Sequence, residues 1–177
     1  MSLAFQDVHG THLEADASDF VTVLAPRDYQ DVAIAAYEDA ELLLTAILPD
    51  ARIEHVGASA VPGAWSRGGV DICVAAPLGT FDEALGVLGE AGYLRRSLDD
   101  GADRRALLAA PDAAVPLTLR LIETGSAHES LMRVRDALRA DISLLARYNA
   151  IRVEAGPRGG AAYARAKAAF FIDVLGR

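Results

Sequence analysis

The sequence predicts an α/β (α+β) fold with a mixed β-sheet of about five strands and helices mainly on one face. Short runs rich in aliphatic and β-branched residues predict strands, and longer segments with apolar residues three or four positions apart predict amphipathic helices. The two kinds of segment follow one another along the 177-residue chain, which favours helices packed on a sheet. A chain of this length has room for one domain with a substantial core.

Five segments have the length and composition of strands. The most regular alternation lies in residues 115–122, where three leucines share one face and Thr118, Arg120 and Ile122 share the other. Glycines bound the two predicted strands on either side of the loop at residues 57–69. The predicted strands are residues 20–24, 53–56, 70–74, 93–95 and 115–122.

Four segments have helical periodicity. The first follows Pro26 and ends before Pro49, and prolines are common just inside and just beyond helix ends. The second ends at Gly92, a frequent residue after a helix C-terminus. Residues 96–114 have the composition of a loop or a ragged hairpin. The predicted helices are residues 28–48, 81–91, 126–148 and 161–175.

Composition and charge narrow the classes of function. Residues 1–19 have little apolar periodicity and are predicted to form a loosely ordered arm before a single domain at residues 20–177. A net charge of −8 argues against non-specific nucleic-acid binding, which needs a basic surface. No apolar run approaches the roughly 18 residues of a membrane span, and a single cysteine indicates no disulfide framework. We therefore expect a cytoplasmic protein with no membrane partner.

The loop between the second and third predicted strands carries the clearest chemical pattern. Gly57-Ala58-Ser59 ends a strand at a tight turn, where backbone N–H groups and a hydroxyl can bind a phosphate. Asp71 lies inside the next strand, where a carboxylate must be paired, hydrogen-bonded or bound to a cation. Together they suggest nucleoside triphosphate chemistry with a divalent metal. A purely structural turn explains the glycine and serine equally well.

These residues also resemble a known family. Ile53-Glu54-His55-Val56-Gly57-Ala58-Ser59-Ala60-Val61-Pro62-Gly63, followed by Val70-Asp71-Ile72, resembles the signature of the GrpB family, and the similarity covers nearly everything after residue 20. That family is similar in fold to the nucleotidyltransferase superfamily, whose members hold magnesium with an Asp-x-Asp or Asp-x-Glu pair. Asp71 matches the first acidic position, but Cys73 stands at the second. The resemblance therefore implies a nucleotidyltransferase-like topology with an incomplete acidic pair.

The predicted site combines this motif with charged residues from later elements. Asp71 is expected to bind Mg²⁺ and act in catalysis, with Glu123 as a second catalytic carboxylate if its strand bends. Lys167 lies on the apolar side of the last helix and resembles the lysine of the family's terminal Tyr-x-x-x-Lys-x-x-Phe helix. From spacing alone its ammonium reaches either water or the cleft. The residues expected to bind phosphate or nucleotide are Gly57, Ser59, Arg67, Arg120 and Lys167.

Three functions remain open from the sequence. The first is a magnesium-dependent nucleotidyltransferase that acts on a nucleoside triphosphate and an unidentified acceptor. The second is a degenerate relative that binds a nucleotide or another phosphorylated small molecule without turnover. The third is a protein-interaction module with a vestigial cleft. Cys73 and His55 are interpreted as structural residues, a buried thiol and a hydrogen-bonded histidine.

Overall fold

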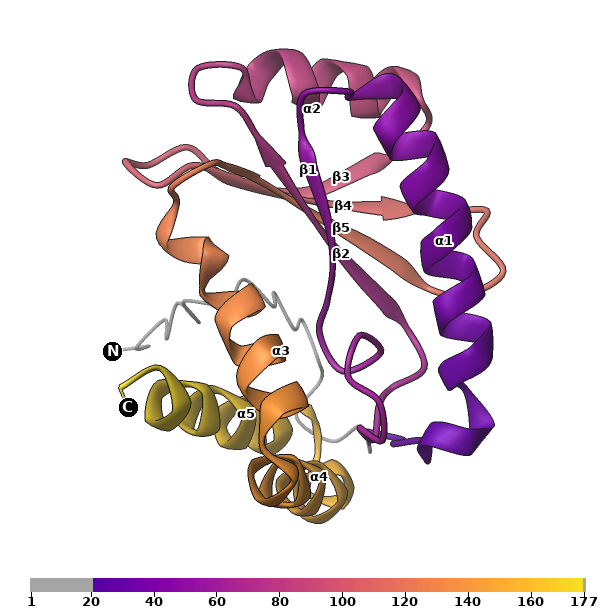
Figure 1. Cartoon of the computed structure of the whole chain (residues 1–177), viewed down its shortest axis with the longest axis vertical. Coiled ribbons are helices and arrows are strands. Elements are labelled where there is room, and N and C mark those ends of the chain that lie inside the picture. Colours follow the sequence, from indigo (N-terminus) through magenta and orange to yellow (C-terminus); the bar gives the residue numbers. More distant parts are fainter. Residues whose placement is uncertain (1–20, 177) are drawn as a thin grey trace.

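The fold is a central sheet between two groups of helices. The structure is a computed structural model that describes residues 21–176, so the predicted N-terminal arm lies outside the described residues. Figure 1 shows helices α1 and α2 on one side of the sheet and α3, α4 and α5 on the other. The predicted mixed sheet of five strands is confirmed. The helices were expected mainly on one face, and in the structure they divide between the two faces.

The sheet brings together the two strands that carry most of the predicted site. Its strand order is β1-β2-β5-β4-β3, and only β2 and β5 are parallel neighbours within it. In that pair Asp71 is level with Thr118, and Cys73 is level with Arg120. The strands are β1 (Arg52–Val56), β2 (Val70–Ala76), β3 (Leu94–Asp99), β4 (Arg105–Ala110) and β5 (Leu117–Glu123).

The helices follow the predicted periodicity, with one exception that is described below. Short 3-10 turns precede α1, precede α3 and join α4 to α5. No helix within residues 21–176 is long and apolar enough to cross a membrane. The helices are α1 (Gln30–Ile47), α2 (Phe81–Glu90), α3 (Ser130–Ala140), α4 (Ile142–Ala155) and α5 (Gly160–Leu175).

Two predicted elements differ in the structure. Where a strand was expected at residues 20–24, Leu24 forms only an isolated bridge with Ser66, and the fifth strand is β4, which pairs with β3 as a hairpin. The helix expected at residues 126–148 is interrupted at Asp141, whose backbone is extended. The Asp141 carboxylate accepts hydrogen bonds from two backbone N–H groups of α4, so it caps that helix and starts it in a new direction.

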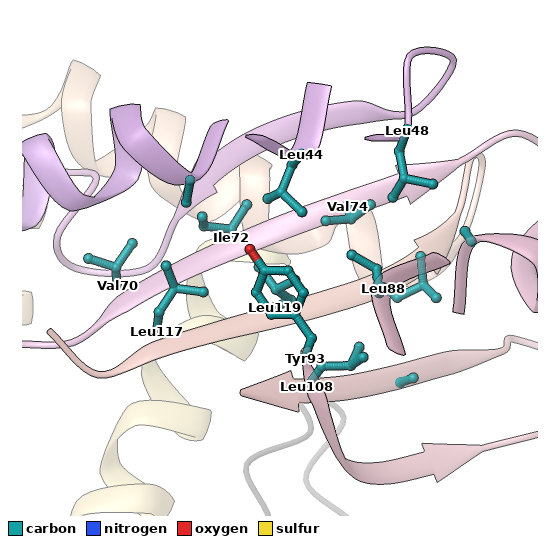
Figure 2. Close-up of a cluster of buried hydrophobic side chains, with 14 of the residues drawn as sticks. Leu44, Leu48, Val70, Ile72, Val74, Leu88, Tyr93, Leu108, Leu117 and Leu119 are labelled. Carbon is teal, nitrogen blue, oxygen red and sulfur yellow. The ribbon is translucent and has the colours of Figure 1, made fainter. Parts of the chain in front are cut away.

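The larger core lies between the sheet and the α1/α2 layer. Alternate residues of β2 and β5 point into it, because successive side chains of a strand face opposite sides of the sheet. Figure 2 shows Leu44 of α1, and Leu48 just after that helix, over these strands, with Leu88 of α2 and Leu108 of β4 beside them. This continuous apolar contact fixes the sheet that carries the site.

The opposite face has a divided core. A small cluster joins Met132 of α3 to four apolar residues of the sheet face, while Tyr148, Phe170 and Phe171 form a separate cluster among α3, α4 and α5. The sheet residues of the small cluster are Val56, Cys73, Ala75 and Ile122. Because the helices have their own core, they do not need to cover the whole sheet face.

Candidate functional site

A cleft of about 420 Å³ lies between this sheet face and the helices α4 and α5. Residues of all strands except β1 line it, together with part of the loop at residues 58–69. Within residues 21–176 its charged lining consists of five cations and one carboxylate, although the whole chain has a formal net charge of −8. These residues are Arg67, Asp71, Arg96, Arg120, Arg152 and Lys167. The cleft is therefore electropositive in an acidic protein.

Asp71 and Arg120 form an ion pair on the floor of the cleft. They share one face of β2 and β5, and Arg120 Nη2 lies 3.2 Å from Asp71 Oδ1. Arg120 is only 8% exposed, whereas the Asp71 side chain is 32% exposed. A buried guanidinium needs a compensating negative charge. Asp71 supplies that charge, and it also faces the space where a ligand would enter.

Gly57 lies directly against this carboxylate. Its φ of +74° is in the left-handed region, and a Cβ at this position would stand 2.6 Å from Asp71 Oδ2. No other residue type fits that space without movement of Asp71. Gly57 therefore lets the loop backbone approach the carboxylate.

Side chains from both helical layers hold the loop at residues 57–69. They form hydrogen bonds with backbone groups of the loop, at ordinary distances of 2.6 to 3.1 Å. The side chains are Tyr29 and Gln30 on the α1 side, and Arg139 and Asn149 from α3 and α4. The shape of the loop is therefore fixed by the fold rather than by a ligand.

Ser59 does not face the cleft, contrary to the predicted phosphate contact. It is 2% exposed, and its hydroxyl lies 2.9 Å from His55 Nε2. The His55 ring stacks on Tyr37 of α1, with 4.3 Å between ring centroids. Burial, with a contribution from Arg139, lowers the pKa of His55 to about 4, so the imidazole is neutral near pH 7. His55 is thus a hydrogen-bonded structural histidine, and Ser59 is its partner.

Glu123 is not brought to Asp71, and its predicted catalytic role needs correction. It is level with Ala76 at the far end of β2, five positions from the level of Asp71, or about 16 Å along the strand. It also belongs to the other side of the sheet, because it has the parity of the leucines in the main core. Its carboxylate accepts a hydrogen bond of 3.0 Å from the backbone N–H of Gly79. Glu123 therefore anchors a turn.

Lys167 and Arg67 do reach the cleft. Lys167 is half-buried on α5, and its ammonium lies 5.3 Å from the ring centroid of Phe171. It lines both the main cleft and a smaller adjoining pocket near Gly57 and Asp71. Arg67 is exposed on the loop at the cleft wall. The packing of the Lys167 stem leaves its charge at the site, as the predicted position on the apolar side of its helix allows.

The residues present do not fit a magnesium site of the two-carboxylate kind. Asp71 is already paired with Arg120, and Glu123 is remote. Cys73 is fully buried, and burial raises the pKa of its thiol to about 12. The part of the chain that the structure describes contains no group of three or more His, Cys, Asp or Glu side chains placed to hold a metal ion. Cationic side chains, rather than carboxylates, dominate the cleft.

The cleft also contains two cations and a tyrosine that were not predicted as site residues from the sequence. They are Arg96 from β3, Arg152 from α4 and Tyr163 from α5. Tyr163 is four positions before Lys167, so helical spacing alone indicates that both share one side of α5. Nothing in the sequence marks Arg152, whose position depends on the break at Asp141 that redirects α4.

The sheet and its two helical layers form a nucleotidyltransferase-like α/β fold. The structure is similar to that of the Cid1 poly(U) polymerase, with a TM-score of 0.51 and 16% identity over 70% of this chain and 38% of the polymerase chain. The sequence model of the GrpB protein family matches residues 25–177. The chain therefore belongs to the GrpB family.

Two relatives agree with this assignment. The crystal structure of the conserved protein GrpB from Enterococcus faecalis has a TM-score of 0.69 and 19% identity, over 88% of this chain and 98% of that one. The UPF0157 protein VC_A0354 of Vibrio cholerae is 31% identical over 150 residues, which are 85% of this chain and 79% of the relative. The predicted family and nucleotidyltransferase-like fold are thus confirmed.

Proposed function

We propose that the cleft binds a nucleoside triphosphate, or another phosphorylated small molecule, by direct contact with cationic side chains. The observation that carries this proposal is the excess of five cations over one carboxylate in the lining of the cleft. Such a local concentration of positive charge in an acidic chain attracts polyanions and disfavours neutral ligands.

Three of these cations come from different parts of the cleft and are proposed to bind one phosphate chain. Arg120 lies on the cleft floor, Lys167 projects from α5, and Arg67 lies on the loop. Arg120 is oriented by its bond to Asp71, and a guanidinium with fixed orientation can donate two parallel hydrogen bonds to a phosphate. The packed stem of Lys167 limits the entropy that its ammonium loses on binding.

This arrangement favours binding that needs no divalent metal. Magnesium normally neutralises phosphate oxygens and requires oxygen ligands from the protein. Here Arg120 lies at the carboxylate that would hold the ion, and the second carboxylate of the pair is absent. The second of the three functions, binding without turnover, therefore fits the cleft best.

Magnesium-dependent nucleotidyl transfer is the second candidate. It is favoured by the position of Asp71 on β2 beside the Gly57 turn, and by a fold neighbour whose structure was solved with Mg and 3'-dATP bound. It requires that Mg²⁺ compete with Arg120 for Asp71. Release of pyrophosphate that depends on Mg²⁺ and disappears in Asp71→Asn would establish transfer and replace the binding proposal.

The binding proposal is tested by thermal unfolding with ATP, GTP, CTP and UTP, each in EDTA and in Mg²⁺. A ligand that binds the native state raises its stability by RT ln(1 + [L]/Kd), so a rise in Tm is expected in both buffers. Lys167→Met keeps most of the apolar stem and removes the charge. It should lower the affinity for ATP about 10- to 100-fold, with little change in the Tm of the ligand-free protein.

Two further variants separate the roles of the carboxylates. Asp71→Asn removes the negative charge from the cleft and should leave ATP affinity in EDTA unchanged or higher, whereas a metal-dependent site would lose ATP affinity in Mg²⁺. Glu123→Gln is the matched control, because Glu123 lies on the other side of the sheet. If no nucleotide raises the Tm at millimolar concentration, the proposal fails and the interaction module is favoured.

A further inference from the structure

Arg152 is a buried cation without a carboxylate partner. It is 5% exposed, and among residues 21–176 it forms no ion pair. Its Nη1 donates to the hydroxyl of Tyr148, and its guanidinium lies 5.0 and 5.3 Å from the ring centroids of Tyr148 and Tyr163. Arginine is rarely buried without a compensating negative charge. Within residues 21–176, therefore, no anion compensates the charge at this position.

Two polar atoms at this position also lack a hydrogen-bond partner in the part of the chain that the structure describes. They are Nε of Arg152 and the hydroxyl of Tyr163, and both residues line the cleft. Tyr163 is 4% exposed, and burial raises its pKa to about 12, so its hydroxyl stays protonated near neutral pH. The large majority of buried side-chain polar atoms in proteins have a partner. Two unpaired groups next to each other indicate a missing acceptor.

We propose that Arg152 and Tyr163 form a second anion subsite that receives one compact oxyanion, a phosphate or a carboxylate group. This inference rests on the proposed function only in the identity of the ligand that fills the rest of the cleft. It is distinct from the position of Lys167, because Tyr163 and Lys167 are one turn apart on α5, about 6 Å along the helix axis. Arg67 also lines the cleft and contributes positive charge at Tyr163.

An oxyanion satisfies each requirement of this subsite. Its charge compensates the guanidinium, and its oxygens accept from Nε of Arg152 and from the hydroxyl of Tyr163. The aromatic rings beside the guanidinium hold its plane in place, so the donors are already oriented. A neutral ligand would fill the space and leave the charge of Arg152 uncompensated.

The test titrates inorganic phosphate, and separately acetate, into protein saturated with ATP and follows Tm. A further rise with phosphate, acetate or both is expected in the wild type, and the stronger of the two identifies the group preferred. Tyr163→Phe should weaken this second binding about five- to tenfold, because it removes one donor to a charged acceptor. Its ligand-free Tm should be unchanged or higher, since the lost hydroxyl has no partner within residues 21–176.

Two variants make the result specific. Tyr93→Phe is the control, because Tyr93 is a buried tyrosine of the main core on the other side of the sheet, and it should bind both anions as the wild type does. In Lys167→Met, a titration with phosphate alone tests the second subsite even if this variant does not bind ATP. Failure of the proposed function can therefore be distinguished from failure of the subsite. Absence of any anion-dependent rise, or equal anion affinity in Tyr163→Phe and the wild type, would overturn the subsite.

Discussion

The two faces of β2 and β5 are made from alternate residues of the same strands, yet they serve different purposes. On the face covered by α1 and α2 the inward side chains are aliphatic and fully or almost fully buried. On the other face the strands carry Asp71, Cys73, Thr118 and Arg120, two of which line a cleft as a charged pair. One face provides stability, and the other holds charge where a ligand can reach it.

The continuous core on one face of the sheet allows the protein to keep charged groups at its centre. The apolar contact on the first face is continuous, so it stabilises the sheet without help from the second. The helices of the second face form their own cluster and leave part of the sheet open. Substitutions on the two faces should therefore differ in their effect on folding and on binding.

The largest difference is expected for a carboxylate placed on each face. Val74→Asp puts a charge among fully buried aliphatic side chains and should lower the free energy of unfolding by about 4 kcal/mol or more. Cys73→Asp is equally buried but level with Arg120, so its cost should be about 2 kcal/mol lower. Urea denaturation of both variants measures the difference.

The same Cys73→Asp variant also tests the metal site. It restores the second acidic position, and we expect higher affinity for Mg²⁺ by titration than in the wild type. A folded variant with unchanged Mg²⁺ affinity would show that the geometry of β2, and not only the missing carboxylate, excludes the ion. Equal destabilisation by Val74→Asp and Cys73→Asp would contradict the distinction between the faces.

The next effect concerns loss of apolar volume. Leu119→Ala removes a fully buried side chain from the main core and should cost about 3 kcal/mol. Thr118→Ala changes the next residue, which faces the cleft and is half-buried, and should cost less than about 1 kcal/mol. Thermal and urea unfolding of the pair provides the measurement. A cost for Thr118→Ala as large as that for Leu119→Ala would show that the cleft face also carries the stability of the sheet.

A smaller effect is expected from the side chains that hold the loop. Asn149→Ala removes bonds to Gly63 and Trp65, and Gln30→Ala removes bonds to Gly63 and Val61. Each should lower the free energy of unfolding by about 1 to 2 kcal/mol. The two costs should add in the double variant if the layers hold the loop independently. Strong non-additivity would show that they act as one unit.

The smallest effect is a pH dependence from His55. Its folded pKa of about 4 lies below the usual 6.5, so the unfolded chain binds the proton more readily. Its contribution to stability is therefore complete above pH 6.5 and is lost as the pH falls towards 4. Between pH 7 and 5.5 this difference in pKa should lower the free energy of unfolding by about 1 kcal/mol. The slope of unfolding free energy against pH should be shallower in His55→Gln, and an identical slope would exclude His55 as its source.

Much of the fold and part of the site could be predicted from residue patterns. Alternation along β5 separates Arg120 from the three leucines, and the same parity separates Glu123 from Arg120. Helical spacing puts Lys167 on the inner side of α5. These features follow from the period of a single element, and a single element is what a sequence pattern reports.

The rest depends on how distant segments meet. The Ser59 hydroxyl faces away from the cleft because His55, four residues earlier, bonds it beneath the stacked ring of Tyr37. Arg152 reaches the cleft because Asp141 ends one helix and caps the next. The long apolar stripe at residues 126–148 contains no signal for that interruption other than the aspartate itself. Both outcomes are tertiary effects on locally ambiguous sequence.

The contact between Gly57 and Asp71 couples the residue types that positions 57 and 71 can hold. A side chain at position 57 and a carboxylate at position 71 would compete for the same space, because a Cβ there comes within 2.6 Å of Asp71 Oδ2. Alanine at position 57 would require residue 71 to move or to be shorter, and either change removes the ion pair between Asp71 and Arg120. A substitution at position 57 therefore alters the charged floor of the cleft, although position 57 itself carries no charge.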